Sequence, residues 1–62
     1  MTKQEMMNKM VRDFGMENEH VINFFRWCEN NPNAKSIDVM DAYNENVSHA
    51  VREILDNSVR VW

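Results

Sequence analysis

Two histidines and one cysteine are the side chains of this 62-residue sequence best suited to metal binding or nucleophilic chemistry. On a helical reading, His20 and Cys28 lie on neighbouring faces, and His49 lies on the polar face of a later helix. A structural zinc site needs four ligands at short, regular spacings. These three residues do not provide such a set, so we expect a solvated histidine, a buried structural thiol, and no metal or other cofactor.

Carboxylates and a serine are the remaining candidates for chemistry. Asp38, Asp41 and Glu45 share one face of a helix but lack the histidines that accompany carboxylates in di-iron bundles, which predicts a solvated acidic face. Ser48 and His49 are adjacent, so on a helix they point ~100° apart and form no working dyad. The sequence also contains no glycine-rich phosphate loop or nucleophile elbow. We therefore predict that the protein is not an enzyme.

The element that positions most of these groups is a long stretch in the second half of the chain, residues 36–57. At ~100° per residue, its larger apolar side chains fall within one half of a helical wheel: Ile37, Val39, Met40, Tyr43, Val47, Ala50, Val51, Ile54 and Leu55. Charged residues occupy the other half, where Ala42 is the only apolar side chain. The pattern predicts one amphipathic helix, about 30 Å long at ~1.5 Å per residue.

Two shorter helices are predicted before it, at residues 3–14 and 18–30. The first begins with a capping box at residues 2–5 and stops at Gly15, where a glycine commonly ends a helix. The second begins at Asn18 and ends before Pro32. Val21, Phe25 and Cys28 mark the centre of its buried face on the wheel. The sequence thus predicts an all-α fold of two short helices packed on one long helix.

Size and composition define the class of protein. A chain of 62 residues forms one domain, residues 1–62, and buries a small core. The net charge of −3 argues against binding to nucleic acid. The single cysteine fits a reducing compartment such as the cytoplasm. Residues 1–5 precede no apolar run, and no stretch approaches the ~20 apolar residues of a membrane span, so we expect neither a signal peptide nor membrane insertion.

The long helix carries more apolar surface than two short helices can cover. We expect those helices to cover residues 37–51, and the later part to be left for self-association or a partner protein. The residues expected there are Val51, Ile54, Leu55, Val61 and Trp62. Residues 58–62 either form a last helical turn or fold back over the core, and the sequence fits both. Trp27 extends the apolar arc of the second helix and fits an interface or the core equally well.

Part of the chain resembles the ubiquitin-associated (UBA) domain, a three-helix protein-binding fold. Phe14-Gly15-Met16 stands where that family has a Met-Gly-Phe/Tyr loop, and Asn30-Asn31-Pro32 matches a turn after its second helix. Val21, Ile22 and Phe25 match its apolar positions, whereas Phe24 and Trp27 replace small residues and the third helix is too long. The resemblance covers residues 14–32. It implies protein binding, with Phe14, Gly15 and Met16 as a contact loop.

These observations predict a small protein-binding regulator, an inhibitor or adaptor, that acts through helix-mediated contacts and self-associates. One alternative is a DNA-binding transcriptional regulator, although Asp38 and Asp41 then stand where bases would be read. Another is an oligomer that sequesters a small ligand at a subunit interface.

Overall fold

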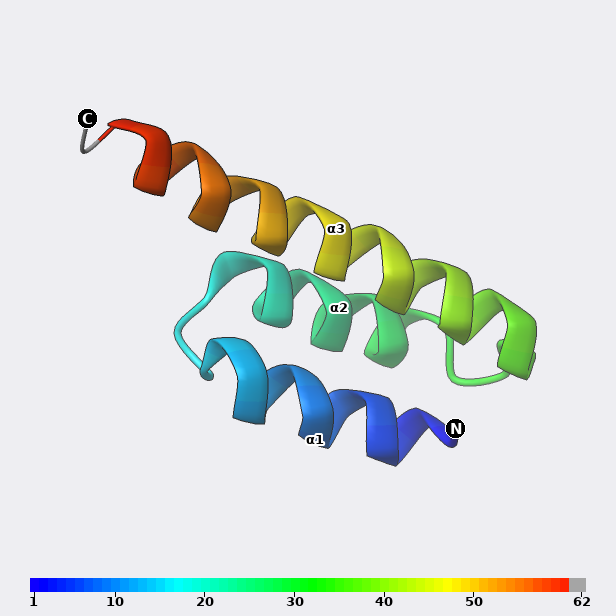
Figure 1. Ribbon diagram of the computed structural model, residues 1–62. Helices are drawn as coiled ribbons and strands as arrows, with labels where there is room; N and C mark the ends of the chain where they lie inside the picture. Colours follow the sequence, from blue (N-terminus) through cyan, green and yellow to red (C-terminus); the bar gives the residue numbers. More distant parts are fainter. Residues whose placement is uncertain (61–62) are drawn as a thin grey trace.

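Three helices form an antiparallel bundle in the computed structural model, which describes residues 1–60 (Figure 1). They are α1 (Lys3–Phe14), α2 (Glu19–Asn30) and α3 (Ser36–Arg60), and each contacts the other two. The all-α prediction is confirmed, with α3 extending the predicted long helix to Arg60. The predicted interface residues Val61 and Trp62 lie outside the described residues.

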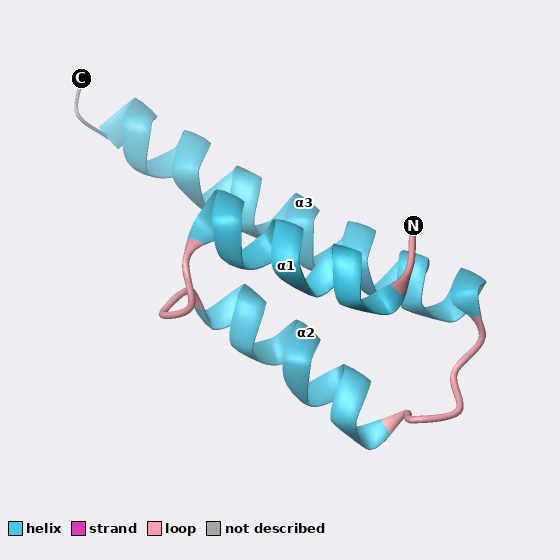
Figure 2. Ribbon diagram, turned by 90° about the horizontal axis from the view of Figure 1, so that it is seen from below, coloured by secondary structure: helices cyan, strands magenta, loops and turns pink. Residues whose placement is uncertain are grey.

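The last turns of α3 project beyond the end of the bundle. Figures 1 and 2 show them passing the connection between α1 and α2. The 25 residues of α3 are slightly more than twice the 12 of each shorter helix, and the molecule measures 45 × 19 × 18 Å. None of the helices in residues 1–60 has the length and apolarity of a membrane span. Residues 51–58 of α3 are all exposed, whereas buried and half-buried residues occur in its earlier part.

Local signals set the ends of the short helices. The Thr2 hydroxyl oxygen accepts a hydrogen bond from the Glu5 backbone N–H at 3.2 Å, and the Asn18 side-chain oxygen accepts one from the His20 N–H at 2.8 Å. Gly15 ends α1 with a φ of 90°, a conformation that disfavours residues with a Cβ, and its N–H donates to the Val11 carbonyl. These caps end α1 at Phe14 and begin α2 at Glu19, and the short connection between them reverses the direction of the chain.

The core is formed by one face from each helix. Its fully covered side chains are Met6, Met10, Val21, Phe24, Cys28, Val39, Ala42 and Ala50. On α2 the prediction that Phe25 marks the centre of the buried face is wrong. Phe24 is completely buried there, and its ring lies edge-on to Tyr43, while Phe25 is half-buried. The centre of the face is therefore rotated towards α3.

The face that α3 turns to the bundle consists of smaller side chains than the wheel predicts. Val39, Ala42 and Ala50 are buried, so the expectation that Ala42 faces solvent is wrong. Ile37 and Met40, expected to be covered, remain exposed. The small side chains of Ala42 and Ala50 let the backbone of α3 approach the other helices closely, so the buried face of α3 includes these two alanines. The bulkier aliphatic side chains of α3 are left on its outer side.

Candidate functional site

The outer side of α3 carries two groups of exposed aliphatic side chains, separated by Asn44 and the half-buried Val47, which we together call the outer stripe. Its members and their exposed fractions are Ile37 66%, Met40 43%, Val51 42%, Ile54 52% and Leu55 59%. Four of them belong to a series with alternating steps of three and four residues: Ile37, Met40, Asn44, Val47, Val51, Ile54 and Ser58. This heptad spacing is that of a helix packing against a second helix.

The predicted interface residues fall on two separate surfaces. Val51, Ile54 and Leu55 are members of the outer stripe. Trp27 is half-buried and lines a groove between α2 and α3 together with Ala42 and Asn46. The structure thus brings the three α3 residues together but separates Trp27 from them. Sequence reasoning did not include Ile37 and Met40 because it assumed that α1 and α2 would cover them.

The groove around Trp27 is mainly polar. It runs along the C-terminal half of α2, the connection at residues 31–35 and the first turns of α3. Several asparagines line it, and Asp38, Asp41 and Glu45 form its acidic wall. These three carboxylates are exposed, as expected of a solvated acidic face. The groove offers hydrogen-bond acceptors beside one half-buried aromatic ring.

The predicted UBA-like contact loop lies at the end of α1. Phe14 packs against the core, Gly15 supplies the helix cap, and Met16 is 59% exposed. Only Met16 therefore presents a large apolar side chain to solvent. The loop lies at the end of the bundle that the last turns of α3 pass (Figure 1).

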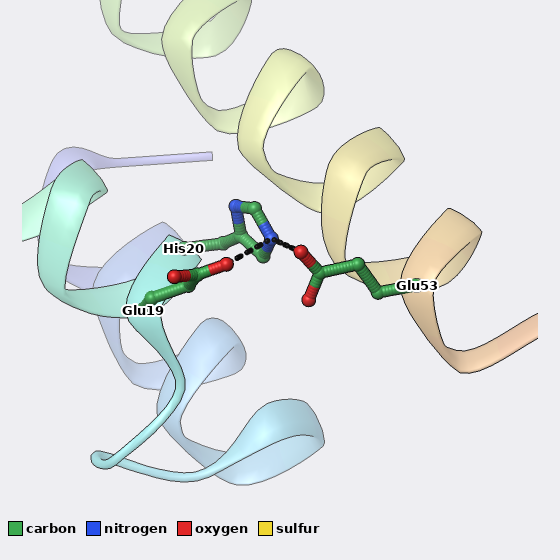
Figure 3. Close-up of side chains that lie close together, drawn as sticks. All are labelled: Glu19, His20 and Glu53. Atoms are coloured by element: carbon green, nitrogen blue, oxygen red, sulfur yellow. Dashed lines mark ion pairs between the residues drawn. The ribbon is translucent and has the colours of Figure 1, made fainter. Parts of the chain in front are cut away.

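A second constellation joins α2 to α3 and was not predicted. His20 Nε2 lies 3.0 Å from Glu53 Oε1 and 3.5 Å from Glu19 Oε1, as Figure 3 shows. The Nε2 atom is buried, and its close contacts are with these two carboxylate oxygens. The His49 ring stacks on His20 with the ring centres 5.8 Å apart. We call Glu19, His20 and Glu53 the carboxylate–histidine cluster.

Folding changes the acidity of one member of this cluster. The pKa of Glu53 lies below that of an ordinary glutamate, first because of its contact with the His20 side chain and next because of Glu19. Partial desolvation acts in the opposite direction. The cluster therefore stabilises the ionised form of Glu53 in the native protein.

We expect this pKa shift to make the protein less stable in acid. The native state favours the Glu53 carboxylate more than the unfolded state does. Its contribution is thus complete above the ordinary glutamate pKa of about 4.3 and is lost as the pH falls through the lowered native value. Thermal unfolding of Glu53→Gln between about pH 3 and pH 7 should show a smaller acid-induced fall in midpoint than wild type.

A matched control for that measurement is Glu29→Gln. Glu29 is an exposed glutamate of α2 and takes part in no ion pair of the described residues. Its removal should leave the acid-induced fall of the midpoint unchanged. The linkage would be disproved by equal pH profiles for wild type and Glu53→Gln.

Cys28 has the environment of a structural residue. Its side chain is buried in the core, and burial raises the pKa of its thiol, with a smaller opposing effect from Lys3. A thiol with a raised pKa is a poor nucleophile and a poor metal ligand at neutral pH. Cys28 therefore acts as a small apolar side chain between the helices.

Comparison with known proteins identifies no relative of this chain: no protein-family model, curated protein or solved structure matches it. The UBA-like resemblance of residues 14–32 stays a prediction.

Proposed function

We propose that this protein is a small protein-binding regulator that forms a homodimer through the outer stripe of α3. The exposure of five large aliphatic side chains in one row carries this proposal. Large apolar side chains exposed together on one side of a helix often mark an interaction site. The buried free thiol of Cys28 supports a reducing compartment, such as the cytoplasm, as its location.

The size of the stripe suits a second copy of the chain. The five residues are each 42–66% exposed. With about 200 Å² for a fully exposed residue of this size, they present roughly 500 Å² per chain and about 1,000 Å² in a symmetric pair, the lower limit for a specific interface. Flanking polar residues would add to this area. A symmetric dimer uses the same patch twice, so it needs no second kind of surface.

An antiparallel pair of α3 helices covers the stripe most completely. If the two-fold axis passes beside Val47, Ile54 and Leu55 of one copy lie over Ile37 and Met40 of the other. The projecting end of each α3 then packs along the beginning of its mate. In this register Met40 lies opposite Ile54 and Val47 opposite its own copy, whereas Val51 lies beside Tyr43 and Asn44.

Charge also favours the antiparallel arrangement. The first half of α3 carries Asp38, Asp41 and Glu45 without a basic residue, and Arg52 follows in the second half. In the antiparallel register Arg52 lies on the same flank as Asp41 and Glu45 of the other copy. A parallel pair would instead separate Arg52 from these carboxylates, because residues with equal numbers then lie at equal heights along the two helices.

A dimer of this kind presents two copies of the groove around Trp27 to a further protein. Tryptophan is a frequent anchor of protein interfaces. The asparagines and carboxylates that surround it suit a basic or amide-rich peptide segment. The same acidic wall weighs against the DNA-binding alternative, because phosphates would approach three exposed carboxylates on the first turns of α3.

The proposal is tested by the molar mass in solution. We expect sedimentation equilibrium of the full chain to show a monomer–dimer equilibrium, with the dimer dominant at high protein concentration. Because dimerisation buries apolar side chains, moderate salt should weaken it far less than it would weaken phosphate binding. A single monomeric mass over the whole concentration range would exclude self-association through α3.

A further inference from the structure

We propose that Glu19, His20 and Glu53 bind one divalent transition-metal ion of the zinc type between α2 and α3. These residues come from the first turn of α2 and from the part of α3 that approaches the end of the bundle (Figures 1 and 3). The site is independent of the outer stripe and requires no second chain.

The spacing of the donor atoms fits such an ion. The ligand atoms of the three residues all lie within 4.8 Å of one another, and His20 Nε2 is 3.0 Å and 3.5 Å from the nearest oxygens of Glu53 and Glu19. Ligands that bind zinc tetrahedrally at about 2.0–2.2 Å are separated by about 3.4 Å. Both glutamates are exposed, so small rotations of their side chains suffice to complete the geometry.

The charges of the cluster also point to a cation. Two carboxylates that converge repel each other unless a proton or a cation lies between them. Within the described residues, neither Glu19 nor Glu53 forms an ion pair with lysine or arginine. Only the imidazole of His20 stands between them. A divalent ion would neutralise both carboxylates at once.

The buried nitrogen of His20 provides the second observation. Its Nε2 is shielded from solvent and its closest polar contacts are the two carboxylates, although the side chain as a whole is 12% exposed. Buried polar atoms normally have a partner, and the lone pair of a neutral imidazole is the commonest metal donor in proteins. The atom also lies on the side of the ring that faces both carboxylates (Figure 3).

The donor set selects the class of metal. One imidazole nitrogen with two carboxylates suits zinc and neighbouring transition metals, whereas calcium and magnesium prefer oxygen ligands alone. Three protein ligands leave a fourth position for water. Because the ligands come from two helices, the bound ion would hold the start of α2 against α3 and stabilise the fold by mass action.

Titration of the full chain with Zn²⁺ alone tests the proposal. Calorimetry at a protein concentration where the chain is monomeric should show one equivalent bound per chain, and the thermal midpoint should rise with Zn²⁺ concentration. Co²⁺ should give the visible absorption of a four-coordinate site. His20→Gln and Glu53→Gln should each lower the affinity by at least about tenfold.

Glu29→Gln is the matched control and should bind Zn²⁺ as wild type does. Glu53 is an exposed residue, so Glu53→Gln should fold even if His20→Gln does not. The helical circular dichroism of each variant, measured without metal, shows whether it folds. The proposal is overturned if wild type shows no saturable binding up to millimolar Zn²⁺, or if Glu53→Gln binds it unchanged. The cluster would then be a histidine shared as an ion pair between two glutamates.

Discussion

Replacing Phe24 with alanine is expected to leave much of the protein unfolded at 25 °C. Phe24 is the largest of the fully buried side chains, belongs to the core cluster and lies edge-on to the ring of Tyr43. Removal of a buried phenylalanine side chain costs about 3–5 kcal/mol. A domain of this length has a total stability of about 3–9 kcal/mol, at ~0.05–0.15 kcal/mol per residue. The loss is therefore comparable to the whole stability.

Phe25→Ala is the matched control, because it removes the same side chain from the next position. Phe25 is half-buried, so we expect this variant to lose about 1–2 kcal/mol and to remain folded. Urea unfolding followed by circular dichroism, at one low protein concentration for all variants, measures both losses. A greater loss for Phe25→Ala would mean that the buried face of α2 is centred where the helical wheel places it.

The positions of the helices were predictable because their signals are local. Thr2, Gly15, Asn18 and Pro32 act within one or two turns of themselves, and the predicted ends differ from the observed ones by three residues at most. Only the end of α3 moved appreciably, to Arg60. There the sequence offers neither a glycine nor a proline to stop the helix.

The rotation of each helix about its axis was less predictable. A wheel ranks side chains by hydrophobicity, so it places Ile37 and Met40 inside and Ala42 outside. Helix packing also depends on how closely two backbones can approach, and this favours the line of Ala42 and Ala50. The buried face that packing selects is rotated by part of a turn from the face that the wheel selects. The apolar residues left uncovered by this rotation include Ile37 and Met40 of the outer stripe.

The carboxylate–histidine cluster was missed for another reason. Glu19 and His20 are neighbours in α2, but Glu53 belongs to α3 and lies more than 30 residues later in the sequence. Motif spacing within one helix carries no information about such a set. It becomes visible only when the register of α2 against α3 is known, and that register follows from core contacts such as Phe24 against Tyr43.

A charge placed in the outer stripe should abolish dimerisation without unfolding the chain. Ile54 is 52% exposed in the single chain, so Ile54→Glu should leave the bundle intact. In the symmetric dimer the substitution occurs twice, and each buried carboxylate without a partner costs at least ~1–3 kcal/mol. We expect the dissociation constant to rise at least about 25-fold, since two such losses cost at least ~2 kcal/mol and 1.4 kcal/mol corresponds to a factor of ten.

Asn57→Glu serves as the control for that variant. It adds the same charge at an exposed position about 60° round the helix from Ile54, on the side away from the other members of the outer stripe. Sedimentation equilibrium should give wild-type dimerisation for Asn57→Glu and a monomer for Ile54→Glu, with equal helical circular dichroism for both. Equal weakening by the two variants would indicate a general charge effect and would remove the support for the outer stripe.

The direction of the two α3 helices can be determined by exchanging charges. In the antiparallel register, Arg52→Glu places an acid beside Asp41 and Glu45 of the other copy and should weaken the dimer. Adding Asp41→Lys and Glu45→Lys to that variant should restore it, because the opposite charges again meet across the interface. In a parallel pair, Arg52 lies seven or more residues, at least about 10 Å, along the axis from Asp41 and Glu45 of the other copy, so the three substitutions together should restore nothing. Recovery in the triple variant therefore requires both the proposed face and the proposed direction.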